Sequence, residues 1–187
     1  MQIGGRILGG TIKTKYAQEG AKDTANSSYE IVADIFKQLT VYDDDVLVDV
    51  GCGKGRVLNF WINRFPNNEK IGIELDPDVA AFTRERLKKY TNCEIISGNI
   101  IDYLPQQGTI FFLFNPFEEY MVEKFKNTIK EQGSDNVVIV YLLCEHINVF
   151  ENDEEWEIRY IQKKKRKWHT TAVIMRKERS DDRIRLR

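Results

Sequence analysis

Acidic and glycine residues spaced to bind a small molecule lie in the first half of the chain. In the segment VLVDVGCGKGRV, an apolar run contains Asp49 and then ends in Gly51, Gly53 and Gly55. Glycines at a strand end let the main chain approach a ligand closely, and the N-terminus of the helix that follows favours an anion. Glu74 follows 19 residues after Gly55, in the segment IGIELD, where a second strand ends. A carboxylate there can accept hydrogen bonds from both hydroxyls of a ribose.

Two other nucleotide-binding motifs fit the glycine segment poorly. A P-loop requires G-x-x-x-x-G-K followed by Ser or Thr, whereas Lys54 is followed by Gly55. A dinucleotide-binding G-x-G-x-x-G needs a glycine where the chain has Arg56, which disfavours a nicotinamide-dependent oxidoreductase. The remaining pattern, acid-x-G-x-G-x-G, leaves two interpretations open: a ligand site at the edge of a sheet, or a glycine-rich turn without a ligand.

Alternating strand and helix patterns must position these residues. The strand-like segments are nearly continuous apolar runs, as in a parallel sheet that helices cover on both faces, so the sequence predicts an α/β fold. We predict parallel strands at 46–50, 70–75, 93–97, 109–114 and 136–143. We predict helices from a capping box of Ser27 and Glu30, over 54–65, from Asp76 onward, and over about 118–131. The segments 154–162 and 167–176 have the pattern of two antiparallel strands.

Composition and length are those of one soluble globular domain. The chain has 187 residues, of which 42% are hydrophobic and 30% charged, with a net charge of −1. No stretch approaches the roughly 18–20 apolar residues of a membrane span, and the N-terminus lacks an apolar signal core. We therefore expect a cytoplasmic protein without a membrane partner. Cys52, Cys93 and Cys144 are scattered, which indicates reduced thiols and no metal site.

Charge divides the chain unevenly. Residues 163–187 contain 11 Lys or Arg and 3 Asp or Glu, whereas the rest of the chain is acidic. We expect an N-terminal arm over 1–25 that is flexible or covers a ligand, a main domain over 26–178 and a basic tail over 179–187. A basic run could contact nucleic acid by neutralising phosphates, or it could be the solvated tip of a hairpin; an acidic protein partner is equally compatible. The run consists of Lys163, Lys164, Lys165, Arg166 and Lys167.

Four short segments together resemble a class I S-adenosylmethionine-dependent methyltransferase. They are Asp49-Val-Gly51-Cys-Gly53-Lys-Gly55, Glu74, Asn99 after the third strand, and Asn115-Pro116-Phe117 after the fourth. The resemblance covers about residues 27–176, and the first two segments are its most specific part. It implies a Rossmann-like, mostly parallel seven-stranded sheet in the order 3-2-1-4-5-7-6, with strand 7 antiparallel and helices on both faces. The antiparallel pattern of the two last strands agrees with this order.

The resemblance also implies roles for the residues along the cofactor, S-adenosyl-L-methionine. Asp49 would lie near its amino-acid end, and the Gly51-Cys52-Gly53-x-Gly55 segment would pass beneath it. Glu74, followed by Leu75, would hold the ribose, and Asn99 with Ile100 would lie at the adenine. Asn115 would also contact the cofactor. The family more often has Asp at the position of Asn99. The cofactor has no phosphate group, and its diol and ammonium groups suit carboxylates, so the two acids fit its chemistry.

The Asn115-Pro116-Phe117 segment stands where a methyl acceptor would lie. It partly resembles the N-P-P-Y segment of amino-group methyltransferases, although it has one proline, and also a segment of non-SET histone-lysine methyltransferases. We therefore expect an enzyme that methylates an amine, for example a protein lysine. Three alternatives stay open: an RNA acceptor, a small-molecule acceptor, or a non-catalytic cofactor-binding module that binds nucleic acid. The segment could also be a simple turn, with Phe117 in the core.

Other side chains are weaker candidates for the chemistry. An amine must lose a proton before it attacks, and a carboxylate or imidazole can accept that proton. The candidates for this general base are Glu118, Glu119, Glu145, His146 and His169. Tyr16 and Tyr29 could close over the cofactor, although packing is the simpler role for Tyr29.

Overall fold

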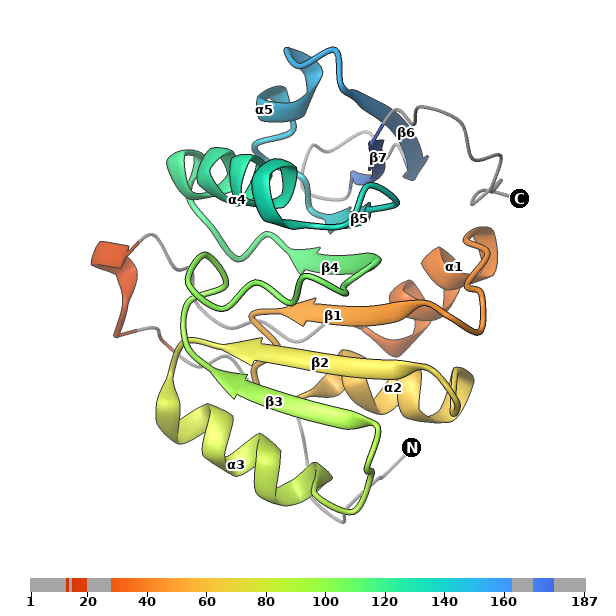
Figure 1. Cartoon of the computed structure of the whole chain (residues 1–187), viewed down its shortest axis with the longest axis vertical. Helices are drawn as coiled ribbons and strands as arrows, with labels where there is room; N and C mark the ends of the chain where they lie inside the picture. The colour runs from red at the N-terminus through yellow and green to blue at the C-terminus, as the bar shows by residue number, and fades with distance from the viewer. Residues whose placement is uncertain (1–12, 14, 20–27, 163–169, 177–187) are drawn as a thin grey trace.

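One mixed sheet organises the residues that the computed structural model describes, which are 13, 15–19, 28–162 and 170–176 (Figure 1). Its seven strands run in the order β3-β2-β1-β4-β5-β7-β6. Strands β1 to β5 pair in parallel, and β7 is antiparallel to both of its neighbours. The strands are β1 (Val46–Val50), β2 (Glu69–Glu74), β3 (Cys93–Ser97), β4 (Ile110–Phe114), β5 (Val138–Leu142), β6 (Trp156–Gln162) and β7 (Thr171–Arg176). This order and the antiparallel β7 confirm the predicted fold.

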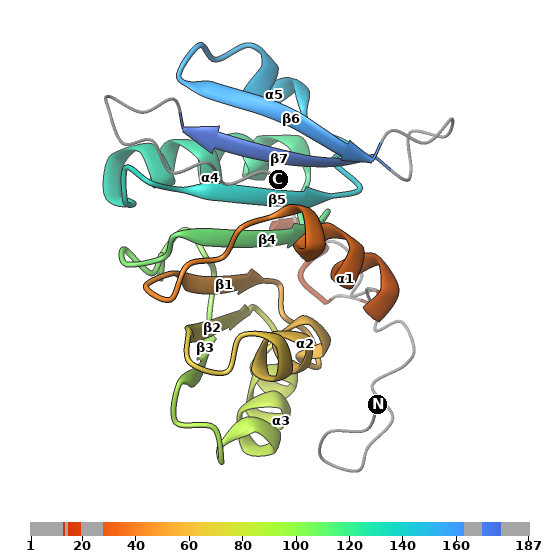
Figure 2. The same ribbon diagram turned by 90° about the vertical axis from the view of Figure 1, so that its right-hand side faces the viewer.

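Helices cover both faces of the sheet (Figure 2). One face carries α1 (Tyr29–Gln38), α2 (Arg56–Arg64) and α3 (Pro77–Leu87), and the other carries α4 (Glu119–Gln132) and the short α5 (Asn148–Glu151). A 3-10 turn, η1, spans Ala17–Glu19. Each strand alternates its side chains between the two faces. In β4, Phe111 therefore packs on Phe125 of α4, whereas Phe112 packs on Trp61 of α2.

The ends of two helices differ from the sequence prediction. The first helix begins at Tyr29 with Ser28 at its N-cap, so the predicted capping box from Ser27 is wrong. The second begins at Arg56 and not at residue 54, because Gly55 has a left-handed φ of 70° that cannot continue a helix. The cap of α3 is as expected: the side chain of Asp76 accepts hydrogen bonds from the amides of Asp78 and Val79.

Several sequence predictions fall on residues outside the described ranges. They are the basic run Lys163–Lys167, the tail over 179–187, His169 and most of the N-terminal arm. Among the described residues, no helix has the length and apolar character needed to cross a membrane.

Candidate functional site

The loop between β1 and α2, residues 51–55, is named here the glycine loop. Its three glycines have left-handed φ angles of 73° at Gly51, 51° at Gly53 and 70° at Gly55. A side chain at any of these positions would be strained, which explains the glycine at every second residue. A Cβ atom on Gly51 would also lie 3.3 Å from Cβ of Pro116, so the ends of β1 and β4 are in close contact.

Two buried carboxylates lie beside the glycine loop. Asp49 is 4% exposed and Glu74 is 7% exposed. Burial, with the neighbouring charge of Glu74, raises the pKa of Asp49 to about 8. Burial also raises the pKa of Glu74, although hydrogen bonds from backbone amides partly oppose this. Oδ2 of Asp49 has no hydrogen-bond partner among the described residues, so the site presents a buried acceptor that suits a donor or a cation.

Glu74 also has a structural role that sequence reasoning missed. Its Oε2 accepts a hydrogen bond from the amide of Gly53 at 2.8 Å, and its Oε1 accepts one from the amide of Asp76 at 3.0 Å. The amides of Gly51 and Cys52 both donate to the carbonyl of Ile73, each at 2.9 Å. The end of β2 therefore holds the glycine loop in place. A carboxylate has about four lone-pair positions, so Glu74 keeps capacity for a ligand.

The loop after β3 continues the same edge of the sheet. The amide of Gly98 donates to the carbonyl of Glu74 at 2.9 Å, which ties this loop to the second acid. Oδ1 of Asn99 accepts from the amide of Ile101 at 3.0 Å, so this side chain folds back on its own loop. Ile100 is buried in the core, which leaves its main chain as the part near the edge. The predicted contacts of Asn99 and Ile100 with an adenine stay predictions.

The ends of β4 and β5 form the other half of the edge. Phe114 of β4 pairs with Leu142 of β5, and the next residue of each strand is a non-glycine with positive φ: 41° at Asn115 and 53° at Leu143. Non-glycine residues rarely adopt a positive φ, because this conformation is strained, and residues strained in this way cluster at functional sites. Two strained residues thus lie at neighbouring strand ends.

A hydrogen-bonded trio follows from these strand ends. Nδ2 of Asn115 donates to Oε2 of Glu145 at 2.9 Å, and the hydroxyl of Tyr141 donates to Oδ1 of Asn115 at 3.1 Å. Tyr141 is fully buried, and its burial raises the pKa of the hydroxyl, so it stays a donor. The amide of Asn115 is therefore fixed in one orientation, with its nitrogen toward a carboxylate. Sequence reasoning had named Asn115 and Glu145 separately and had missed Tyr141.

Pro116 and Phe117 separate into different environments. Pro116 lies next to the glycine loop at Gly51, which brings this segment to the β1–β2 half of the edge. Phe117 is 9% exposed and packs against Phe125 of α4, with ring centroids 6.2 Å apart. Its position favours the packing role, and contact of its ring with an acceptor stays a prediction.

Two of the remaining candidates, His146 and Tyr29, lie in different surroundings. Nε2 of His146 is 3.9 Å from Oε2 of Glu145, and the side chain of His146 is mostly buried. Tyr29 packs on α2 instead: the Arg56 guanidinium lies 4.4 Å from its ring centroid, and Nδ2 of Asn59 donates to its hydroxyl. No cluster of three or more His, Cys, Asp or Glu that could hold a metal occurs among the described residues.

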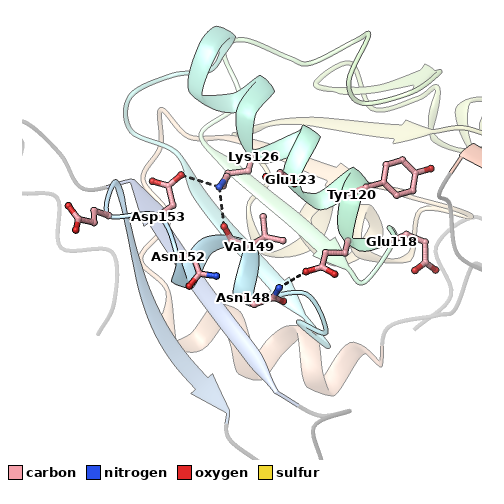
Figure 3. A pocket seen from close by; sticks show the side chains of 10 residues that line it. Glu118, Tyr120, Glu123, Lys126, Asn148, Val149, Asn152 and Asp153 are labelled. Atoms are coloured by element: carbon pink, nitrogen blue, oxygen red, sulfur yellow. Dashed lines mark hydrogen bonds and ion pairs between the residues drawn. The ribbon is translucent and has the colours of Figure 1, made fainter.

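A cavity of about 920 Å³ lies between α4 and α5 (Figure 3). Its lining begins at Glu118, the residue that follows Phe117. Acidic side chains dominate its lining: Glu118, Glu119, Glu123, Asp153 and Glu154. Its basic residue, Lys126, donates to the carbonyl of Val149 and pairs with Asp153 at 3.1 Å. Glu119 accepts a hydrogen bond from Asn148 across the cavity. This flank of the edge therefore has a negative potential.

Comparison with known proteins gives a family for the glycine loop and its surroundings. Residues 47–132 match the family described as "Methyltransferase domain". Among curated proteins, the tRNA (guanine-N(7)-)-methyltransferase of Dictyostelium discoideum is 34% identical over an alignment of 82 residues, and the match covers 36% of this chain and 30% of that protein. The trans-aconitate 2-methyltransferase of Sinorhizobium fredii is 30% identical over 73 residues, 39% of this chain and 27% of that protein. The chain thus spans less than a third of either relative.

Solved structures share most of the fold. An RNA methyltransferase from Salinibacter ruber, in complex with S-adenosyl-L-homocysteine, has a TM-score of 0.62 at 19% identity and covers 84% of this chain and 97% of its own. A precorrin-6y C5,15-methyltransferase from Geobacter metallireducens has a TM-score of 0.60 at 22% identity and covers 84% of this chain and 92% of its own. These likenesses confirm the fold class predicted from the sequence. The match of residues 47–132 to a methyltransferase domain agrees with the resemblance that the sequence motifs indicate.

Proposed function

We propose that this chain is an S-adenosylmethionine-dependent methyltransferase, because its residues 47–132 match a methyltransferase-domain family and its sheet has the Rossmann-like order described above. The observation that carries the proposal is the unpartnered, buried carboxylate oxygen of Asp49 beside the glycine loop. A phosphate-binding site would place a lysine or arginine there, whereas this site places a second acid, Glu74, next to the first. An ammonium group and a ribose diol are the ligand groups that two carboxylates favour.

The residues present fit this cofactor along its length. Asp49 would accept from the ammonium group, the glycine loop would lie against the amino-acid end, and Glu74 would accept from the ribose hydroxyls. When bound, S-adenosylmethionine supplies a methyl group on a sulfonium, which is already activated for transfer. The protein therefore mainly positions the acceptor and excludes water. Contact between Gly51 and Pro116 brings the acceptor-facing segment directly to the glycine loop.

We further propose an amine as the acceptor, as on a protein lysine. Asn115 and Glu145 form a polar pair at the strand ends. The acidic cavity between α4 and α5 is lined by Glu118 and Asn148, which follow the two members of this pair closely in sequence. This arrangement attracts a cationic group and repels a phosphate backbone. A protonated amine must lose a proton before attack, and the Glu145 carboxylate would accept it.

RNA is the second candidate acceptor. Two comparison proteins are named as tRNA and RNA methyltransferases, and the basic run Lys163–Lys167 could neutralise phosphates. A small-molecule acceptor and a non-catalytic module that binds nucleic acid are further outcomes that the test must separate.

Calorimetry with S-adenosylmethionine, S-adenosylhomocysteine and NAD tests the cofactor. We expect binding of the first two and none of NAD; a folded sample that binds neither would refute the proposed function. Incubation of a cell lysate with tritiated cofactor then tests the acceptor, and we expect label in protein that ribonuclease does not remove. Label lost on ribonuclease treatment would assign RNA, label in the small-molecule fraction would assign a metabolite, and absence of transfer despite binding would assign the non-catalytic module.

Asn115→Ala tests the acceptor site directly. We expect turnover on the labelled substrate to fall at least tenfold while cofactor affinity stays within twofold, because the cofactor contacts come from β1, β2 and β3. Full activity of the variant would move the acceptor site away from Asn115.

A further inference from the structure

The glycine loop is held from a second side, by α3. Oγ1 of Thr83 donates to the carbonyl of Gly53 at 2.7 Å. Nη2 of Arg86 donates to the carbonyl of Lys54 at 2.7 Å and to that of Gly55 at 3.4 Å. Helix α3 thus supplies donors to the carbonyls of three consecutive loop residues.

The contact between α3 and the loop is close and buried. Thr83 is fully buried, and Arg86 is anchored a second time through Nη1, which donates to Oδ1 of Asn59 on α2 at 2.7 Å. A Cβ atom on Gly55 would lie 2.8 Å from Nη2 of Arg86 and 2.9 Å from Cγ2 of Thr83. The glycine at this position is therefore required for the approach of α3 as well as for its φ angle.

These contacts determine how the loop presents its amides. In a trans peptide the N–H points opposite to the C=O of the same peptide group. Because the carbonyl of Gly53 is held by Thr83, the amide of Lys54 is directed away from α3. Three left-handed glycines lose much conformational entropy on ordering, and a loop that is already fixed loses less when a ligand binds.

We propose that Thr83 and Arg86 are positioning residues for the cofactor, which set its affinity by fixing the carbonyls of the glycine loop. The inference rests on the proposed function, since it concerns the same cofactor site. Neither side chain is expected to touch the cofactor. Both act through the loop backbone.

Helix α3 offers a matched control. Arg84 lies two residues before Arg86 and also donates to a main-chain carbonyl, that of Ile95 in β3, through Nε at 3.1 Å and Nη2 at 2.8 Å. Arg84→Met and Arg86→Met each remove a guanidinium from a carbonyl contact on the same helix. Only Arg86→Met removes a contact with the glycine loop.

Calorimetric titration with S-adenosylhomocysteine and thermal melts test the proposal. We expect Arg86→Met and Thr83→Val each to raise Kd at least tenfold, about 1.4 kcal/mol, with Thr83→Ser close to the parent. We expect Arg84→Met to lower Tm while Kd stays within twofold of the parent. If Arg86→Met does not fold, the proposal is tested by Thr83→Val and Thr83→Ser alone, and it requires that only Thr83→Val raises Kd.

The outcomes separate this inference from the proposed function. If the parent binds S-adenosylhomocysteine and Thr83→Val binds equally well, the positioning role is refuted and the proposed function stands. An equal rise in Kd for Arg84→Met would also refute it, because the effect would then follow from general destabilisation. Absence of binding by the folded parent would overturn the proposed function and this inference with it.

Discussion

Asp49 gives a direct test of how the site is built. Its carboxylate is buried at the end of β1, and burial with the charge of Glu74 raises its pKa from 3.8 to about 8. At a pH between these two pKa values, Asp49 is protonated in the folded state and ionised in the unfolded chain. The free energy of unfolding therefore falls as pH rises through this range. The substitution Asp49→Asn removes this titration. We therefore expect the variant to gain stability relative to the parent as pH increases from about 4.5 to about 7.5.

The size of this gain in stability depends on the width of the pH range between the two pKa values of Asp49. Each pH unit between the two pKa values changes the free energy of unfolding by up to about 1.4 kcal/mol. Over roughly three units, the difference between variant and parent should change by at most about 4 kcal/mol. For a chain of 187 residues, half of that change would alter the difference in Tm by roughly 4–8 °C.

Thermal melts of the two proteins across this pH range measure the difference. The diagnostic quantity is how the difference in Tm between variant and parent changes with pH. Any effect of the asparagine amide that does not depend on pH adds a constant to this difference and does not alter its change. Glu94→Gln removes an exposed carboxylate in β3 and is the matched control for the change from a carboxyl to an amide. A constant difference for Asp49→Asn would refute the reasoning, since Asp49 would then be ionised in the fold. Saturating S-adenosylhomocysteine should reverse the gain, because the variant lacks the charge that the ammonium group requires.

Three further substitutions test other parts of the molecule. Glu74→Ala should raise the Kd for S-adenosylhomocysteine and also lower Tm, since hydrogen bonds to a charged group contribute about 1.5–3 kcal/mol each; a variant with unchanged Kd would mean that the ribose lies elsewhere. Gly55→Ala should cost at least about 1 kcal/mol of stability in urea unfolding, because of its left-handed φ and the 2.8 Å approach to Arg86. Phe117→Ala should cost about 3–5 kcal/mol as a core ring; unchanged stability with lost turnover would instead place the ring at the acceptor.

The glycine loop and the positions of its two acids at strand ends could be predicted because their signals are local in sequence. Asp49 and the three glycines are contiguous, and each glycine does occupy the left-handed conformation that makes glycine necessary. Glu74 was identified by its position at the end of the second strand, which depends only on the alternation of strand and helix. The parallel sheet then brings these strand ends together without any further information.

The residues that hold the site were not visible in the sequence. Thr83 and Arg86 lie on a helix where polar side chains are ordinary, and their contacts depend on how closely α3 approaches the loop. Tyr141 lies inside the apolar run NVVIVYLL, for which the pattern predicts only a strand. A buried tyrosine hydroxyl usually requires a partner, and that was the one available signal. Its partner, Asn115, is 26 residues away and is brought near only by the pairing of β4 with β5.

This contrast explains why the cofactor is easier to infer than the acceptor. The glycine loop would bind the cofactor through its backbone conformation, which restricts residue type strongly and therefore leaves a motif. The proposed acceptor edge consists of side-chain contacts between strand ends and of the α4–α5 cavity, where many residue types can satisfy the same geometry. At this edge the charge of the residues is more informative than their pattern. Glu145 and the acids of the cavity favour a cation, so a protein amine remains the acceptor that these charges support best.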